Sequence, residues 1–417
     1  MSFAATIIRL AWLLTIANLA APIMARSQIP DAVALPDSVE IPPSEVPRRD
    51  IMDVIHSVLG RRIDPQPTIE RESGLSFSLL PSVGYNPAYG TYVGASLAIG
   101  GWLGDPETTT ISSGSAGVSY STTEQLTVQF RSDFFTPGNK WDFKSDWRYL
   151  DTSQPTYGLG SLSSHDSSYP MDFVMYRFFE TVYRRVHQTP FYVGVGYHFS
   201  QYQDIQDERA DLGELTPFVV YERGYPEQTT SSGISVNVLY ETRDNTINAT
   251  RGTYWNASLR SYAEGLGSDD NWQQLWSDLR VYPNIPRNGR NILGLWSYIW
   301  LTFGHTPYLD LPASGWDTYG RGARGYVQGR IRGESQIYNE LEYRVPLTDD
   351  ELLGAVAFVN FTVTTAQSGS PFGESDAGGG VGIRLKFSKR TATNLTCDLA
   401  WGRKQPGRIF LGMQEVF

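Results

Sequence analysis

The hydrophobic and polar positions of this chain alternate with a period of two over many short segments. In residues 140–150 the aromatic side chains share one face and the charged side chains share the other. The first face carries Trp141, Phe143, Ser145, Trp147 and Tyr149, and the second carries Lys140, Asp142, Lys144, Asp146 and Arg148. Because successive side chains of a β-strand point to opposite faces, this period predicts a strand with apolar surroundings on one side only.

The same alternation recurs along the chain and predicts about sixteen strands. One such segment would also fit a half-buried strand of a soluble sheet, but repeated segments of about ten residues, apolar outside and polar inside, are typical of a transmembrane barrel. The predicted strands are 74–82, 88–101, 109–120, 124–135, 140–150, 172–186, 190–202, 232–243, 252–262, 271–282, 291–303, 333–346, 352–364, 378–388, 392–402 and 407–417. We therefore expect an all-β fold, a transmembrane antiparallel β-barrel of the outer-membrane type, with both ends on one side of the membrane.

The predicted connections between these strands are sorted by length. Short turns lie at 136–139, 187–190, 244–251, 283–290, 347–351 and 388–391, and long connections lie at 151–171, 203–231, 304–332 and 365–376. Short and long connections mostly alternate, as they do in a barrel with tight periplasmic turns and longer extracellular loops. We therefore expect the four long connections to be outside the cell.

The N-terminal part of the chain has the features of a secretion signal and a linker. Arg9 precedes an apolar run that is too short to span a membrane, so residues 1–25 are predicted to be a cleaved signal peptide. Residues 26–72 begin with a stretch rich in Pro, Asp, Glu and Ser and are predicted to be a periplasmic linker. The linker contains helically spaced apolar residues, which predict a short amphipathic helix: Ile51, Val54, Ile55, Val58 and Leu59. The barrel itself is predicted to span 73–417 in the bacterial outer membrane.

Composition and catalytic motifs narrow the chemistry that we expect. The chain has 417 residues and a formal net charge of −10, which argues against nucleic acid as a partner. Cys397 is the only cysteine, so an intrachain disulfide and a cysteine-built metal site are excluded, and we expect no metal and no cofactor. No H-E-x-x-H, G-x-S-x-G or phosphate-binding glycine loop occurs. We therefore expect a protein that is not an enzyme.

Two alternatives to this interpretation stay open. A hydrolase would need a catalytic group, and His165 with Asp166, in a serine-rich connection, is the candidate His–Asp pair. A passive or gated pore is the second alternative, because the predicted lumen is polar. The opposite charges along the inner face of 140–150 favour pairing with a plug over an ion-selective lining.

One motif lies in the long connection 304–332 and the strand after it. Arg324-Gly325-Tyr326 precedes a predicted strand that carries Glu342 and Tyr343. This arrangement resembles the bacterial surface antigen superfamily, the outer-membrane assembly factors of the BamA/TamA type. The turn Arg243-Asp244-Asn245, followed by Arg251-Gly252, is similar to a recurring turn of that family. The resemblance covers roughly 74–417, and we expect a short form without periplasmic POTRA-like modules, because the linker is thin for an independent domain.

The resemblance implies a lock inside the barrel. In that family the long connection folds back into the lumen, and its arginine pairs with acids on the next two strands. The predicted lock consists of Arg324, Gly325, Tyr326, Glu342 and Asn360, with Glu340 and Arg344 as a further network. The planar guanidinium group of arginine can bind a carboxylate through two parallel hydrogen bonds, and a buried charge must be paired. Asn360 stands where the family usually has an aspartate, so Asn360→Asp is expected to tighten the loop.

The C-terminus completes the resemblance. The last predicted strand places Ile409, Leu411, Met413, Glu415 and Phe417 on one face. A C-terminal aromatic residue, here Phe417, resembles the signal that the outer-membrane assembly machinery reads, although Glu415 departs from the apolar pattern. The resemblance implies a protein that assists protein or lipid insertion or translocation, with a seam between the first and last strands. The partners it implies are outer-membrane lipid, the assembly machinery during biogenesis and a periplasmic protein.

Overall fold

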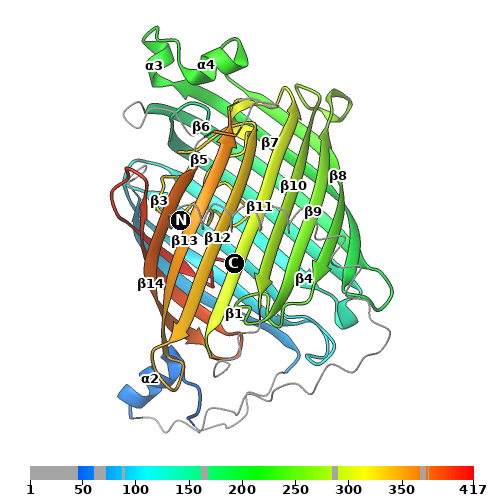
Figure 1. Ribbon diagram of the computed structural model, residues 1–417, viewed down its shortest axis with the longest axis vertical. Helices are drawn as coiled ribbons and strands as arrows, with labels where there is room; N and C mark the ends of the chain where they lie inside the picture. Colours follow the sequence, from blue (N-terminus) through cyan, green and yellow to red (C-terminus); the bar gives the residue numbers. More distant parts are fainter. Residues whose placement is uncertain are drawn as a thin grey trace, which may run out of the picture.

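The fold is all-β. The computed structural model of the protein describes residues 46–60, 72–86, 90–160, 168–283, 290–366, 372–373 and 375–417. The predicted signal peptide and the His165–Asp166 pair lie outside the described residues. One antiparallel sheet of sixteen strands, each paired with its neighbours in the sequence, curls into a tilted barrel (Figure 1). The predicted fold class and strand count are therefore confirmed.

The strands follow the predicted segments, and several of them differ from the prediction in length. They are β1 (Gly74–Asn86), β2 (Gly90–Trp102), β3 (Ser112–Ser121), β4 (Leu126–Phe135), β5 (Trp141–Thr156), β6 (Tyr169–Arg185), β7 (Phe191–Asp207), β8 (Thr229–Glu241), β9 (Gly252–Tyr262), β10 (Trp272–Tyr282), β11 (Ile292–Gly304), β12 (Ser335–Pro346), β13 (Leu353–Thr365), β14 (Asp376–Ser388), β15 (Thr393–Gly402) and β16 (Arg408–Met413). Strands β1 and β5 to β7 are longer than predicted, because backbone pairing continues beyond the apolar–polar alternation. Strand β16 is shorter than predicted and ends at Met413.

Short helices lie before β1 and in the connections between strands. They are α2 (Ile51–Val58), η1 (Pro137–Asn139), α3 (Glu208–Asp211), α4 (Pro217–Glu222), η2 (Glu264–Leu266) and η3 (Tyr308–Asp310). Helices α3 and α4 project from the long β7–β8 connection at the end of the barrel opposite α2 (Figure 1). Within the described part of the chain, no helix has the length and apolar character needed to cross a membrane.

The barrel wall has an apolar outer face and a polar inner face. Trp147 of β5 points outward, and its ring stacks against Phe178 of β6 with a centroid distance of 5.2 Å. The neighbouring Asp146 points inward, where Arg148 donates from Nε to Asp146 Oδ1 at 2.6 Å. The two faces therefore need two different surroundings, as the period-two pattern predicts.

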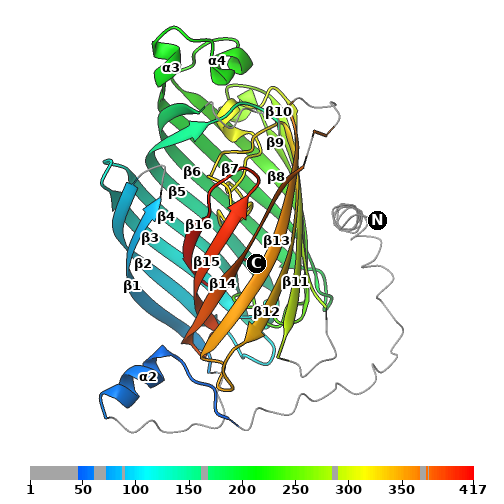
Figure 2. The ribbon, with the colours of Figure 1, turned by 60° about the vertical axis from the view of Figure 1, so that its left-hand side comes forward.

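The two edges of the sheet, β1 and β16, are not paired with each other. The fifteen registers among the described strands join each strand to the next, and none joins β1 to β16. Strand β16 has 6 residues and β1 has 13, so the two edges do not match in length (Figure 2). Unpaired edge strands keep free N–H and C=O groups that can bond another strand.

Helix α2 is attached to the end of the barrel that carries short turns. Asp50 caps the helix, because its side chain accepts hydrogen bonds from the backbone N–H groups of Met52 and Asp53. Lys389, in the β14–β15 turn, binds Asp53 Oδ2 through Nζ at 2.8 Å. The backbone N–H of Arg49 donates to the carbonyl of Asp350, in the β12–β13 turn, at 3.0 Å. The helix and these turns therefore lie at the same end of the molecule (Figure 1).

We expect the attachment of α2 to depend on pH. Burial alone would raise the pKa of Asp53, but the Lys389 side chain and the Asp50 backbone N–H hold this pKa below its usual value. A lowered pKa stabilises the attached state above the unfolded-state value of about 3.9, and this contribution is lost as the pH falls through the folded-state pKa. Limited proteolysis of 46–60 with pepsin should therefore accelerate steeply in that acidic range. In Asp53→Asn the same segment should already be cleaved readily by a neutral protease at pH 7.

Candidate functional site

The connection between β11 and β12, residues 305–334, folds into the barrel, and we call it the lumenal loop. The carbonyl of Leu309 accepts a hydrogen bond from Tyr202 Oη at 3.1 Å. Trp316 Nε1 donates to Gln154 Oε1 at 3.2 Å, on the opposite strand β5. Aromatic side chains of the loop and the wall pack into one buried cluster, with members such as Tyr298. The loop therefore fills the lumen and contacts several strands of the wall.

Arg324 is the centre of a buried ion-pair cluster, which we call the lock. Its Nη2 donates to Glu340 Oε1 at 2.5 Å and to Glu342, both on β12. Its Nη1 donates to Asp398 Oδ2 on β15 at 2.6 Å. The guanidinium carbon lies 3.4 Å from the ring centroid of Phe358 on β13. Because Arg324 and its three acids are almost completely buried, water screens these charges weakly.

The two residues after Arg324 fix the path of the loop along the wall. Gly325 has φ of +105°, and a Cβ at this position would lie 2.7 Å from the carbonyl carbon of Trp401. Any larger residue would therefore be strained and would collide with β15. Tyr326 Oη donates to the Ala377 carbonyl at 2.6 Å and accepts from the Arg403 N–H at 2.8 Å. These bonds hold the loop against the β14–β15 hairpin.

Asn360 has a different position from the one that the sequence suggested. Its Nδ2 donates to the backbone carbonyl of Arg324 at 3.0 Å, and it has no hydrogen bond to the guanidinium group. A Cβ on the facing Gly378 would lie 2.7 Å from Asn360 Oδ1 and 2.9 Å from the same carbonyl, so the absence of a side chain there makes room for the contact. An aspartate would lose this donor and would place a carboxylate oxygen against the Arg324 carbonyl. This contact does not favour the expectation that Asn360→Asp tightens the loop, and we now expect the change to loosen it.

The last four residues, 414–417, turn into the lumen, and we call them the C-terminal tail. Phe417 is buried, and its ring centroid lies 5.4 Å from that of Trp296 on β11 and 6.1 Å from that of Tyr282 on β10. The prediction that Phe417 shares one face of the last strand with Ile409 and Leu411 is wrong, because the strand ends at Met413. Glu415 departs from the apolar pattern because it also lies inside, where Arg384 Nε donates to its Oε2 at 2.7 Å.

The lock and the C-terminal tail belong to one network of charges. Arg344 donates from Nε to Glu342 Oε1 at 2.6 Å and from Nη2 to the Phe417 carbonyl at 2.8 Å. Arg384 donates from Nη1 to Asp398 Oδ1 at 2.5 Å, in addition to its bond to Glu415. Arg321 of the lumenal loop donates from Nη2 to the Met413 carbonyl at 2.8 Å. A change in the position of the loop therefore acts directly on the end of β16.

Sequence reasoning placed Arg324, Glu340, Glu342 and Arg344 near one another, and the structure brings these four together. It missed Asp398, Arg384 and the inward position of Glu415. Asp398 carries a signal that could have been used, because it lies on the polar face of β15, opposite the outward Cys397. Arg384 likewise lies on the polar face of β14. No comparable sequence feature predicts that the C-terminal tail turns into the lumen.

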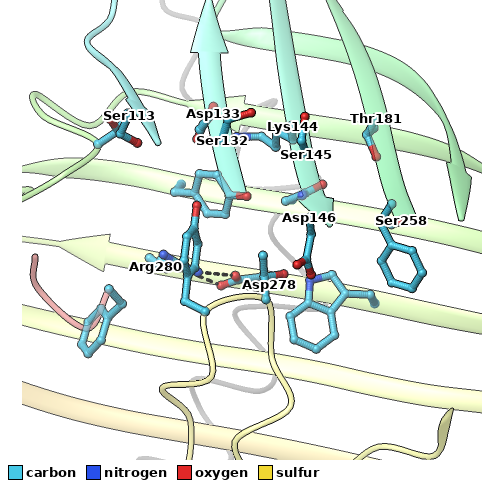
Figure 3. A pocket seen from close by; sticks show the side chains of 18 of the residues that line it. Ser113, Ser132, Asp133, Lys144, Ser145, Asp146, Thr181, Ser258, Asp278 and Arg280 are labelled. Carbon is cyan, nitrogen blue, oxygen red and sulfur yellow. Dashed lines mark hydrogen bonds and ion pairs between the residues drawn. The ribbon is translucent and has the colours of Figure 1, made fainter. Parts of the chain in front are cut away.

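A cavity of about 100 Å³ lies in the lumen between the lumenal loop, the C-terminal tail and the wall. Figure 3 shows charged side chains of both signs around it, with Asp133 and Lys144 on one side and Asp278 and Arg280 on the other. Arg280 donates from Nη2 to Asp278 Oδ2 at 2.8 Å, and Lys144 Nζ lies 2.6 Å from Asp133 Oδ2. The charges are paired with each other, so the lining has no single sign that would select an ion.

The described residues contain no group of three or more His, Cys, Asp or Glu side chains arranged to hold a metal ion. His198 is the histidine that faces the cavity, and its Nε2 shares a hydrogen bond of 2.8 Å with Ser235 Oγ. It is a polar residue of the inner wall, as its place in the alternation predicts. The site is therefore best described as a set of buried ion pairs that fastens a loop and a tail to the wall.

Comparison with known proteins gives structural matches only. No protein-family model and no curated protein matches the sequence. BamA of Haemophilus ducreyi lacking POTRA domains 1–3 is similar at 17% identity and a TM-score of 0.48, over 82% of this chain and 69% of that chain. CdiB of Acinetobacter baumannii (11% identity, TM-score 0.47) is matched over 83% of this chain and 65% of that chain. CdiB of Escherichia coli (9% identity, TM-score 0.49) is matched over 82% of this chain and 61% of that chain. At these identities the likeness concerns the fold alone.

Proposed function

We propose that this protein is an integral outer-membrane barrel that assists the insertion or translocation of protein or lipid. The observation that supports this proposal is the unpaired seam between β1 and β16. A closed barrel satisfies all its backbone groups within the wall, whereas two unpaired edges in a bilayer leave groups without partners. Such edges can bond an incoming strand, and a gap between them gives lipid headgroups a path across the wall. The proposed partners are membrane lipid, the assembly machinery during biogenesis and a periplasmic protein.

The lock and the C-terminal tail provide a way to control this seam. The tail takes residues 414–417 away from the wall, so β16 presents a short edge of six residues. Arg321 and Arg344 hold the tail inside through its carbonyl groups, and Arg344 is itself held by the lock acid Glu342. We propose that the locked loop keeps the seam unpaired. Release of the tail would let β16 extend and pair with β1.

A passive pore is the alternative function, but it is less well supported. The lumenal loop and the aromatic cluster occupy the lumen, and the remaining cavity is small. A steady conductance of the purified protein in planar bilayers would favour the pore. The proposal also assigns no catalytic role to the barrel, and turnover of a lipid or peptide substrate by the purified protein would contradict that part.

The proposal is tested by fastening the seam. In a Cys397→Ser background, cysteines replace Phe77 on β1 and Leu411 on β16, two outward-facing and exposed positions. Bismaleimide reagents of increasing length then join the two strands in protein reconstituted into vesicles. We expect the unjoined protein to accelerate insertion of a second outer-membrane barrel or transfer of a fluorescent lipid between leaflets, and the joined protein to lose this activity.

A matched control joins two strands that are already paired. Val195 on β7 and Val236 on β8 are register partners and are both exposed on the outer wall. Joining cysteines at these positions adds the same reagent without restraining the seam, so activity should persist. Equal activity of the protein joined at the seam, or no activity of the unjoined protein with either substrate, would contradict the proposal.

A further inference from the structure

Helix α2 has its polar and apolar faces in the reverse of the usual arrangement. The side that faces the barrel is polar, since Asp50 and Asp53 are buried there. The apolar side chains point away from the protein, with Val58 80% exposed, Leu59 66% and Met52 48%. A helix docked on a soluble protein normally buries its apolar stripe and exposes its polar one. The exposed stripe of α2 therefore needs a different apolar partner.

The polar face is fixed in place, so the apolar stripe has a defined direction. Lys389 binds both carboxylate oxygens of Asp53 through Nζ, at 2.9 and 2.8 Å. The backbone N–H of Lys389 also donates to Asp50 Oδ2 at 3.1 Å. In the β12–β13 turn, Glu351 Oε2 lies 3.2 Å from Arg48 Nε. These contacts join α2 to two turns and prevent it from rolling its apolar residues against the barrel.

Exposed apolar side chains also lie on the wall near the attachment of α2. Leu347, in the turn that binds Arg48 and Arg49, is exposed, and so are Leu353 at the start of β13 and Ile383 on β14. Helix α2 packs beside the end of β14 (Figures 1 and 2). The helix therefore lies beside a part of the wall whose outer residues face lipid in a membrane barrel.

The charges near α2 suit an anionic lipid surface. Arg48 and Arg49 precede the helix, and their side chains stay 58% and 39% exposed while they pair with Glu351 and Asp350. Exposed arginines at the start of an amphipathic helix attract anionic lipid headgroups, and the apolar face then inserts shallowly at the headgroup boundary.

We infer that α2 is an interfacial anchor whose apolar stripe, Met52, Ile55, Val58 and Leu59, inserts into the periplasmic leaflet beside β13 and β14. The occupant of the stripe is phospholipid. This inference rests on the proposed placement of the barrel in the outer membrane, and it goes beyond that placement because it assigns a lipid contact to a segment outside the wall.

The test measures lipid contact at single positions of the full chain. In a Cys397→Ser background, an environment-sensitive fluorophore is attached to Val58→Cys or to Ser57→Cys, and the protein is reconstituted into phosphatidylethanolamine–phosphatidylglycerol vesicles. Ser57 is exposed but shares the polar side of the helix with Asp50 and Asp53, so it is a matched control. A third label at Val236→Cys reports the outer wall of the barrel. Vesicles with and without lipids brominated near the headgroup are compared.

We expect the label at 58 to shift its emission to the blue and to be quenched by brominated lipid, and the label at 57 to show neither effect. Quenching at 236 without quenching at 58 would overturn the inference, because the stripe would then be exposed to water or would be a binding surface for another protein. Absence of quenching at both 58 and 236 would overturn the membrane placement as well. Equal quenching at 57 and 58 would contradict the assigned orientation of the helix.

Discussion

Replacement of Arg324 by alanine is expected to lower the free energy of unfolding by about 3–5 kcal/mol. The change leaves the carboxylates of Glu340, Glu342 and Asp398 buried together without their shared cation. These acids then repel one another in surroundings that screen charge weakly. Denaturant titration of the barrel in lipid vesicles, followed by the change in electrophoretic mobility on unfolding, measures the loss.

The position of the charge, and not its mere presence, should decide the size of this effect. Arg324→Lys keeps the charge but loses the planar guanidinium group that reaches both β12 and β15. The free energy of unfolding of this variant should therefore lie between those of the wild type and Arg324→Ala. Arg209 is a matched control, because it pairs with Glu214 at 2.6 Å but is partly exposed. Arg209→Ala should cost only about 0–1 kcal/mol. Equal costs at 209 and 324 would show that the lock is not buried.

Replacement of Trp147 by aspartate is expected to cost about 2 kcal/mol near the middle of the membrane, where a lipid-facing arginine or lysine costs about 2–4 kcal/mol and an aspartate less. Trp147 is exposed on the outer wall, and its ring lies between Phe130 and Phe178, with centroid distances of 5.0 and 5.2 Å. Aspartate would place a charge toward lipid and remove both ring contacts. The same denaturant titration of vesicle-bound protein measures the change.

Two controls separate the effect of the charge from the loss of the ring. Trp147→Phe keeps an apolar ring on the outer wall and should cost less than the aspartate change. Leu212→Asp makes the same kind of substitution at an exposed leucine beside α3, away from the wall, and should stay within about 0.5 kcal/mol of the wild type. If aspartate were tolerated equally at 147 and 212, the outer wall would not face lipid.

Apolar surface has two opposite uses in this protein. The outer wall and the stripe on α2 face the same lipid in the proposed placement, whereas the aromatic cluster in the lumen fastens the lumenal loop. The cluster includes Phe417, so the end of the chain acts as part of the core. An outward-directed terminal aromatic residue would have left this space to water.

The strand pattern was decided locally and could be predicted. Each segment of the wall has lipid-facing surroundings on one side and a polar lumen on the other, so its sequence alone carries a period of two. The strand count, the inward acids Glu340 and Glu342 and the outward Trp147 all follow from that parity. The amphipathic character of 51–59 was likewise visible, because helical spacing is a local property.

Long-range contacts were decided only by the tertiary structure. Asp398 and Arg324 are 74 positions apart, and parity shows that an acid points inward but not which arginine it meets. Residues 414–417 are too few to show any period, so their turn into the lumen depends on the space between Trp296 and Tyr282. The sequence by itself therefore determined which side each wall residue faces, because successive side chains of a strand alternate between the lipid and the lumen. Only the packing of loop, tail and wall against one another determined which charges pair, and which face of α2 is left for lipid.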